Sequence, residues 1–424
     1  MMMSAPTTEN AASGNAQQGA EALTLLDALA RAPAAAALVV RALERAGDRK
    51  ALRLAHPQLR DAVGEATTRL ETIVRDGAAA PRPPTPRRWP RLEELTLRSP
   101  GLAALEALGS ETWGRLRTLS IGYQRVDVSP SALDEPCTRA LVAALRRVPA
   151  LRALDLREVA LADDAAAALF RASSAEDAPQ LRLLAVTRAG LTPAAARMIA
   201  ASGWRLEELC LRSNPELGAA GLAALVAAPS FALRRLTLIV CSLDMAAILA
   251  VANAPWPLEE LDLSCNNLSA DAAGPALAAL SRHRGLRRLD VNYCHLNAAS
   301  FKALVEAAWP ALISLCAIGA EMAFAGPHAL GAAAFAGCPA LEELDLSFVD
   351  LGEAGAALLA SRCWSRLRKL NLRFTQLGRA GVAALARGAW PALSYLDLEE
   401  IGLSAPLALE EARRWAPKLD TLRQ

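Results

Sequence analysis

The sequence predicts an α/β solenoid, a horseshoe with a parallel β-sheet on its concave side and helices on its convex side, preceded by a small helical N-terminal segment. Three features predict this fold: a leucine pattern at nearly regular spacing, a change from strand to helix periodicity inside each unit, and tryptophans at one point of the unit. Internal repetition with a period of roughly 20–50 residues is typical of stacked repeats, which bury their apolar faces against each other.

The pattern Leu-x-x-Leu-x-Leu occurs twelve times when Ile, Val or Ala is accepted in place of the last leucine, and a truncated thirteenth copy begins at Leu419. Most copies lie 24 to 30 residues apart, and one interval is 35 residues long. We therefore expect one array over residues 91–424, with twelve repeats and a C-terminal stub. The twelve copies begin at Leu92, Leu116, Leu151, Leu181, Leu206, Leu233, Leu258, Leu286, Leu312, Leu341, Leu367 and Leu393.

Each unit begins with an alternating stretch, of which LEELDLSCNNL from Leu258 to Leu268 is the clearest. A period of two indicates a strand, with the leucines at positions one, four and six buried and the variable residues on the concave face. A helical stretch follows, as in residues 218–228, 297–309 and 378–390, where Leu and Ala recur at helical spacing. The small alanine side chains predict helices that pack close to the sheet.

Tryptophan recurs two to four residues before the first leucine of a unit. We expect these side chains to fill the turn from helix back to strand, because they follow the packing period; a stacking platform for bases or sugars is the weaker alternative. Position nine is also interpreted as structural, since Asn214, Cys241, Asn266 and Cys294 stand where the backbone turns. The tryptophans are Trp89, Trp113, Trp204, Trp256, Trp309, Trp364, Trp390 and Trp415.

These repeats resemble the ribonuclease-inhibitor type of leucine-rich repeat, and the AGVAALA and AGLAALV stretches are similar to its GALA-type variant. The resemblance extends over residues 91–424. It implies a curved surface that binds a protein partner, and no particular partner, because one fold serves many functions.

The part of the chain before the array is predicted in three pieces. Residues 1–20 have the composition of a disordered tail, residues 21–75 are helical in pattern, and residues 76–90 form a stiff Pro-rich linker. An end repeat exposes its core, so the helical piece is either a separate module or a cap for the first repeat.

Residues 37–63 resemble an F-box, with apolar positions at helical spacing on both sides of Gly47-Asp48. Ala55-His56 stands where F-boxes usually have Val-Cys, and Ala32-Pro33 stands near the place of their usual Leu-Pro. The resemblance implies that apolar side chains of this segment dock a Skp-type adaptor. The predicted adaptor-binding residues are Leu38, Val39, Leu43, Leu52 and Leu59.

Composition excludes several classes of partner. The chain has 46 basic and 44 acidic residues and a net charge of +2, which argues against a nucleic-acid or membrane-surface partner. No apolar run reaches the roughly 18 residues of a membrane span, and the polar start does not resemble a secretory signal. The eight cysteines lack C-x-x-C pairs and fit reduced thiols. We expect a cytoplasmic protein, with the nucleus, the cytoskeleton or the ciliary axoneme as alternatives.

No catalytic, cofactor-binding or metal-binding residue is predicted, and we expect a protein that is not an enzyme. The four histidines lie in different segments, and no metalloprotease, hydrolase or phosphate-loop motif occurs. Position five carries a column of carboxylates that opposite charges on neighbouring strands compensate. The column consists of Asp155, Asp262, Asp290, Asp345 and Asp397.

The concave face of the last three full repeats is the predicted site for a protein partner. Phe348 and Phe374 occupy position eight of adjacent units and form a candidate hot spot; the alternative is that both rings tuck under the following loop. The insertion at residues 123–137 in the 35-residue unit is a second candidate surface. The predicted partner-binding residues are Glu343, Asp345, Phe348, Lys369, Asn371, Arg373, Phe374, Tyr395, Asp397 and Glu399.

Two classes of function follow. In the first, the chain is an F-box-like substrate receptor of a cullin–RING ubiquitin ligase that presents a protein substrate on its concave face. In the second, it is a scaffold of a cytoskeletal or ciliary assembly with no ubiquitin-ligase link. Residues 34–65 discriminate between them.

Overall fold

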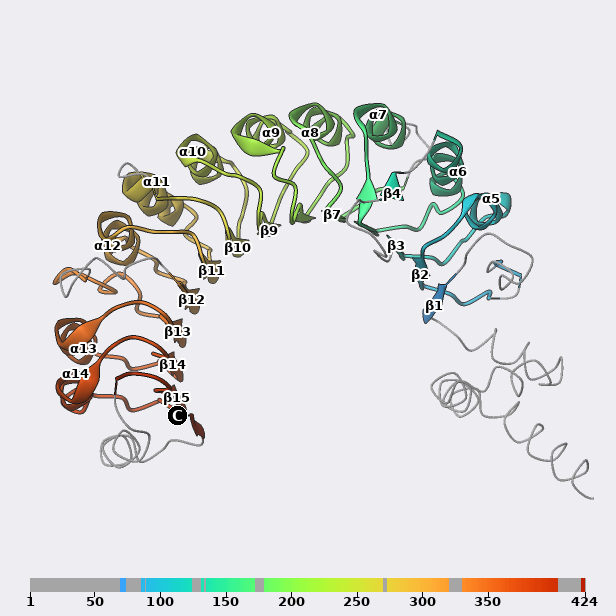
Figure 1. The fold of residues 1–424 in the computed structure, drawn as a ribbon. Coiled ribbons are helices and arrows are strands. Elements are labelled where there is room, and N and C mark those ends of the chain that lie inside the picture. Colours follow the sequence, from blue (N-terminus) through green and yellow to red (C-terminus); the bar gives the residue numbers. More distant parts are fainter. Residues whose placement is uncertain are drawn as a thin grey trace, which may run out of the picture.

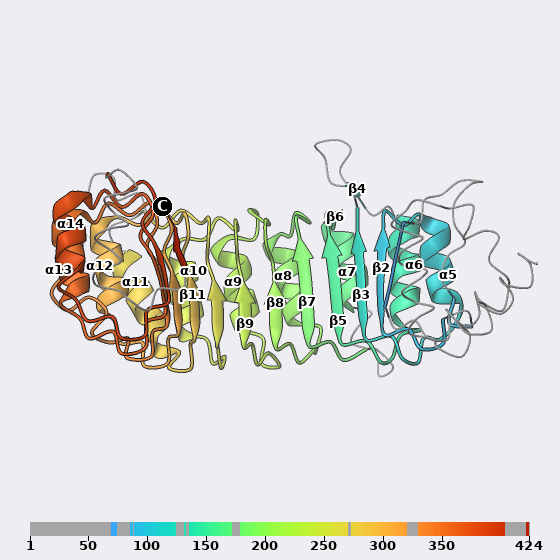
Figure 2. The ribbon, with the colours of Figure 1, turned by 90° about the horizontal axis from the view of Figure 1, so that it is seen from below.

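The computed structural model describes residues 69–73, 85–87, 89–123, 131–132, 135–171, 179–269, 273–319, 330–402 and 421–423. In this part of the chain one long sheet follows the inside of an arc and a row of helices follows the outside (Figure 1). Seen from below, the strands lie side by side along the inner surface with the helices behind them (Figure 2). The α/β horseshoe with a concave parallel sheet is confirmed.

The sheet has fourteen strands within the described residues, and each pairs in parallel with its neighbours. In this sheet the twelve strands from β2 to β15, which do not include β4 and β6, are those of the twelve predicted repeats, and β16 is that of the C-terminal stub. The strands are β1 (Arg69–Ile73), β2 (Glu94–Arg98), β3 (Thr118–Gly122), β5 (Ala153–Arg157), β7 (Leu183–Thr187), β8 (Glu208–Cys210), β9 (Arg235–Thr237), β10 (Glu260–Asp262), β11 (Arg288–Asp290), β12 (Ser314–Cys316), β13 (Glu343–Asp345), β14 (Lys369–Asn371), β15 (Tyr395–Asp397) and β16 (Thr421–Arg423).

Strand β1 corrects the expectation that the chain is helical up to residue 75. It pairs with β2 in the register of a repeat, with Leu70 beside Leu95 and Thr72 beside Leu97. The leucine pattern is hidden here because Thr67 and Thr72 stand at positions one and six. The β-branched residues at 67, 68, 72 and 73 nevertheless favour a strand. The remainder of residues 1–75 lies outside the described residues.

Ten α-helices are described on the convex side, and those at 218–226, 298–306 and 378–385 confirm the three helical stretches predicted above. Polar side chains begin several of them: Thr192 accepts backbone N–H groups at the start of α8, and Asp244 and Asn297 do so at the starts of α10 and α12. The helices are α5 (Leu102–Ser110), α6 (Glu135–Leu145), α7 (Asp163–Arg171), α8 (Pro193–Ala200), α9 (Gly218–Val226), α10 (Met245–Asn253), α11 (Ala273–Ala279), α12 (Ala298–Glu306), α13 (Gly352–Ala360) and α14 (Gly378–Leu385).

The core lies between the sheet and the helices. Leu258, Leu261 and Leu263 are at most 1% exposed, which confirms that positions one, four and six are buried. Six tryptophans are buried in the turns that lead back to the strands. The indole N–H of Trp309, for example, donates to the Leu304 carbonyl at 2.9 Å, near the end of α12. Trp113, Trp364 and Trp390 donate to helix carbonyls in the same way, whereas the buried indole N–H groups of Trp204 and Trp256 have no hydrogen-bond partner among the described residues.

Position nine supports the turns, as predicted. The Asn266 amide donates to the Leu238 and Leu263 carbonyls, both at 2.7 Å, and its oxygen accepts from the Cys241 N–H at 3.0 Å. The Cys294 thiol donates to the Leu263 carbonyl at 3.2 Å. Burial raises the pKa of Cys294 to about 12, so this group stays a thiol at neutral pH and is a poor nucleophile.

Candidate functional site

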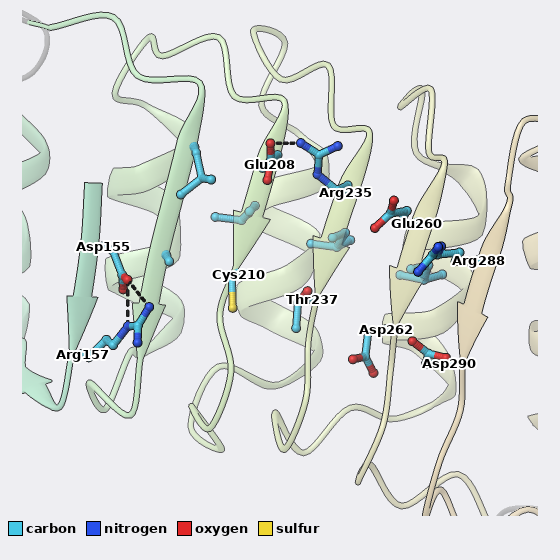
Figure 3. Close-up of a pocket in the computed structure, with 15 residues that line it drawn as sticks. Asp155, Arg157, Glu208, Cys210, Arg235, Thr237, Glu260, Asp262, Arg288 and Asp290 are labelled. Atoms are coloured by element: carbon cyan, nitrogen blue, oxygen red, sulfur yellow. Dashed lines mark hydrogen bonds and ion pairs between the residues drawn. The ribbon is translucent and has the colours of Figure 1, made fainter. Parts of the chain in front are cut away.

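Charged side chains on the concave face compensate one another where the strands begin. Glu208 pairs with Arg235 on the next strand, as Figure 3 shows. Further along, Lys369 donates to Glu343 at 2.6 Å. Such cross-strand pairs fix the orientations of exposed side chains and add little stability. Where the strands begin, the charges on the concave face are therefore neutralised by residues of neighbouring strands.

The carboxylate column lies nearer the ends of the same strands, and its members have different surroundings. Asp262 lies directly across from Asp290 on β11. In Figure 3 the Asp262 and Asp290 side chains lie below those of Glu260 and Arg288. Burial, with the charge of Asp262 adding, raises the pKa of Asp290 above its ordinary range. Asp155 differs, because it holds Arg157 of its own strand at 2.6 Å.

Within the described ranges no group of three histidine, cysteine or acidic side chains is placed to hold a metal ion. Two carboxylates of the column accept hydrogen bonds from the backbone. The Ser264 N–H donates to Asp262 and the Ser347 N–H donates to Asp345, both at 3.0 Å. Asp262 and Asp345 thus stabilise the turns after β10 and β13.

The predicted partner-binding residues come together on β13, β14 and β15. The Asn371 amide donates to Asp345 at 2.9 Å, and Arg373 pairs with Glu399 at 2.8 Å. The Tyr395 hydroxyl donates to Asp397 at 3.2 Å. With the Lys369 and Glu343 pair, these contacts form a polar network that joins side chains of the last three full repeats.

Phe348 and Phe374 stack on each other at the edge of this network. Their ring centroids lie 4.6 Å apart with an angle of 16° between the planes. The Arg373 guanidinium lies 5.0 Å from the centre of the Phe374 ring. Phe348 is 46% exposed, so its ring does not tuck under the following loop. The pair is an apolar patch with a charged rim.

Both phenylalanines have left-handed backbone, with φ of 63° at Phe348 and 56° at Phe374. Bulky residues rarely adopt this conformation, which costs about 1–2 kcal/mol relative to glycine. Position eight is left-handed in most units, including Val240 and Tyr293 with φ of 53° and 54°. The chain therefore places large apolar side chains at points where its own backbone favours glycine.

Tyr293 is the aromatic residue at position eight of the unit that begins at Leu286. It is 50% exposed, and an ideal Cβ on Gly319 would lie 2.7 Å from its ring. The ring therefore lies over Gly319 of the next unit. We call the position-eight row the apolar edge; it consists of Val240, Cys265, Tyr293, Gly319, Phe348 and Phe374. Reading position eight of successive units as one column would have revealed it from the sequence.

Beside the apolar edge a shallow pocket opens at its β9–β11 end. Val240, Cys265 and Tyr293 line it together with Asp244 and His295. Cys265 is exposed, and all eight cysteines of the chain are free thiols. The pocket extends the apolar edge beyond the residues predicted from the sequence.

Several predicted sites fall outside the described residues. All five predicted adaptor-binding residues lie there, and so do most residues of the insertion at 123–137. The described part of the insertion includes β4 (Ser131–Ala132), which pairs in parallel with β6 (Val159–Ala160). Among the described residues no helix has the length and apolar character needed to cross a bilayer.

A curved parallel sheet with helices on its convex side, built from leucine-patterned units, defines a leucine-rich-repeat solenoid. The family described as "Leucine Rich repeat" matches residues 257–274 and 366–386 of this chain. These segments cover β10 with its following turn, and β14 with α14. No curated protein matches the chain.

Two solved structures illustrate the similarity at low sequence identity. The TLR13–ssRNA13 complex is 20% identical over 75% of this chain, with a TM-score of 0.45, and this chain spans only 41% of that one. One chain of the Rad7 and Elc1 complex in yeast is 15% identical to this chain, and the match covers 99% of this chain and 93% of that chain, with a TM-score of 0.46.

Proposed function

We propose that this chain is a protein-interaction module that acts by binding rather than by catalysis, and that it is an F-box-like substrate receptor of a cullin–RING ubiquitin ligase. Its repeats resemble the GALA-like form of the ribonuclease-inhibitor type. The concave face presents a protein substrate, and the segment before the array docks a Skp-type adaptor.

The stacked Phe348 and Phe374 rings are the observation that carries the binding role. The exposed Phe348 ring and the half-buried Phe374 ring leave apolar surface in solvent, and a partner would recover its solvation free energy on burying it. The surrounding network of Asp345, Asn371 and Arg373 supplies oriented polar groups at the rim. Interfaces concentrate their affinity in such aromatic anchors and use the charged rim for orientation.

The adaptor role rests on the sequence of residues 34–65. Its test is a pull-down of the full chain with a purified Skp-type adaptor, compared with the double variant Leu43→Asp, Leu52→Asp. We expect the unaltered chain to retain the adaptor and the variant to lose it, with the same melting temperature for both. Absence of binding by the unaltered chain contradicts the ligase role.

A scaffold without a ubiquitin-ligase link is the second candidate, and β1 favours it. Because β1 continues the sheet in register and Leu70 packs against the core, the array has begun by residue 69. Residues just before it are therefore well placed to cap the solenoid. If the Leu43→Asp, Leu52→Asp variant unfolds instead of losing the adaptor, these side chains belong to a cap.

A further inference from the structure

In the six units from Leu258 to Leu393, acidic and basic side chains are distributed unequally between positions two and three, where each strand begins, and positions five, seven, eight and ten, at and after its end. We call the first set the balanced half of the unit and the second set its acidic half. Positions two and three hold four acidic and four basic side chains. Among the described residues, positions five, seven, eight and ten hold seven acidic side chains and one basic side chain, Arg373. The seven are Asp262, Asp290, Asp345, Asp350, Asp397, Glu399 and Glu400.

The charged side chains of the balanced half neutralise one another, and those of the acidic half do not. Glu259 pairs with Arg234, and Glu342 pairs with Arg368 at 3.7 Å. In the acidic half, within the described part of these units, Arg373 with Glu399 is the ion pair present. Burial raises the pKa of Asp290, and the charge of Asp262 adds to this effect while Arg288 opposes it.

The apolar edge runs along this acidic half. Phe348 follows Asp345 after β13, Phe374 follows Arg373 after β14, and Tyr293 follows Asp290 after β11. Exposed rings beside uncompensated carboxylates match a partner that offers apolar side chains and cations together. Arg373 over the Phe374 ring shows that these rings accept a guanidinium.

We propose that the apolar edge and the carboxylates beside it bind an extended protein segment that carries lysine or arginine side chains next to apolar ones. This inference rests on the protein-binding role proposed above and adds the chemistry of the partner. A single-stranded nucleic acid would also stack on the rings, but its phosphates have the same charge as the carboxylates and would be repelled.

The span of the apolar edge fixes the length of the segment. Val240 follows β9 and Phe374 follows β14, five strand spacings apart. Parallel strands lie about 4.8 Å apart, so the edge is about 24 Å long. An extended chain advances about 3.3 Å per residue, so about seven residues cover it.

A display library of random octapeptides, selected on the full-length chain at low salt, tests the proposal. We expect the enriched peptides to contain lysine or arginine in excess of acidic residues, together with apolar residues. The affinity of an enriched peptide is then measured by fluorescence anisotropy. It should fall as salt is added, because salt screens exposed charges.

Two double variants of the same two units provide the decisive comparison. Asp262→Asn with Asp345→Asn removes two charges from the acidic half and keeps the oxygen that accepts the backbone N–H. Asn371 already accepts the Arg373 N–H in this way, at 3.1 Å. Glu259→Gln with Glu342→Gln removes two charges from the balanced half. We expect the first variant to weaken binding about tenfold and the second by less than about twofold.

Three results would overturn the proposal: no enriched peptide, enriched peptides that are acidic or neutral, or equal effects of the two double variants. If decauridine binds the natural chain and this binding is lost in the Phe348→Ala variant, the apolar edge would be assigned to nucleic acid instead. The adaptor pull-down depends on residues 34–65, so its failure and the failure of the peptide selection are separate outcomes.

Discussion

At the scale of single residues, the leucines of the strands provide most of the packing. Leu261 is 1% exposed and lies between Leu236 and Leu289 on the neighbouring strands. We expect Leu261→Ala to lower the free energy of unfolding by about 2–5 kcal/mol, because it leaves a cavity between two repeats. Urea denaturation followed by circular dichroism measures this change. A loss below about 1 kcal/mol would show that the repeats do not share one packed core.

Asp290 gives a prediction with a definite dependence on pH. Its pKa is raised in the folded chain by burial first, with Asp262 and Glu260 adding to the effect while Cys316 and Arg288 oppose it. The stability that it contributes is therefore full below its unfolded pKa of about 3.9 and is lost as the pH rises through its folded pKa. Asp290→Asn cannot ionise, so we expect it to be more stable than the natural chain at pH 7.

The two denaturation midpoints for Asp290→Asn and the natural chain should converge at pH 3, where the natural carboxyl is protonated in both states. The comparison at two pH values serves as its own control, because the other carboxyls are common to both chains. A variant that is less stable at pH 7 would show that Arg288 holds the ionised form.

At the scale of the helices, close packing requires glycine where α14 crosses the turn before it. An ideal Cβ on Gly381 would lie 2.9 Å from the Leu377 Cβ, which is fixed by the backbone. Alanine would favour the helix by about 1 kcal/mol, but overpacking typically costs about 1–3 kcal/mol. We expect Gly381→Ala to lower the melting temperature. Gly114→Ala is the control, since nothing lies within 4 Å of its added Cβ, and it should not destabilise the chain.

The sequence was sufficient for the strands of the twelve repeats, because each leucine pattern specifies both the strand and its buried face. It was insufficient for β1, where threonine replaces two of the three leucines. At the candidate site it predicted the stacked Phe348 and Phe374 from adjacency alone. It did not join Tyr293 to this pair, because the packing of that ring over Gly319 is a contact between two units that a single unit cannot show.

At the scale of the whole molecule, stacking turns one position of a short unit into a continuous surface. Position eight of six successive units forms the apolar edge, and the positions beside it form the acidic half of the concave face. The same stacking places large side chains at left-handed backbone, where they cost stability. A feature that repeats at a cost in stability indicates a role in binding rather than in folding.

Phe348→Gly tests this central claim most directly, by its melting temperature and its affinity for a peptide selected on the natural chain. Glycine relieves a left-handed conformation that costs about 1–2 kcal/mol, and it removes a ring stack worth about 0.5–1.5 kcal/mol. We predict an unchanged or higher melting temperature and an affinity about tenfold lower or more. A clear drop in melting temperature with unchanged affinity would contradict the account, because the ring would then belong to the core.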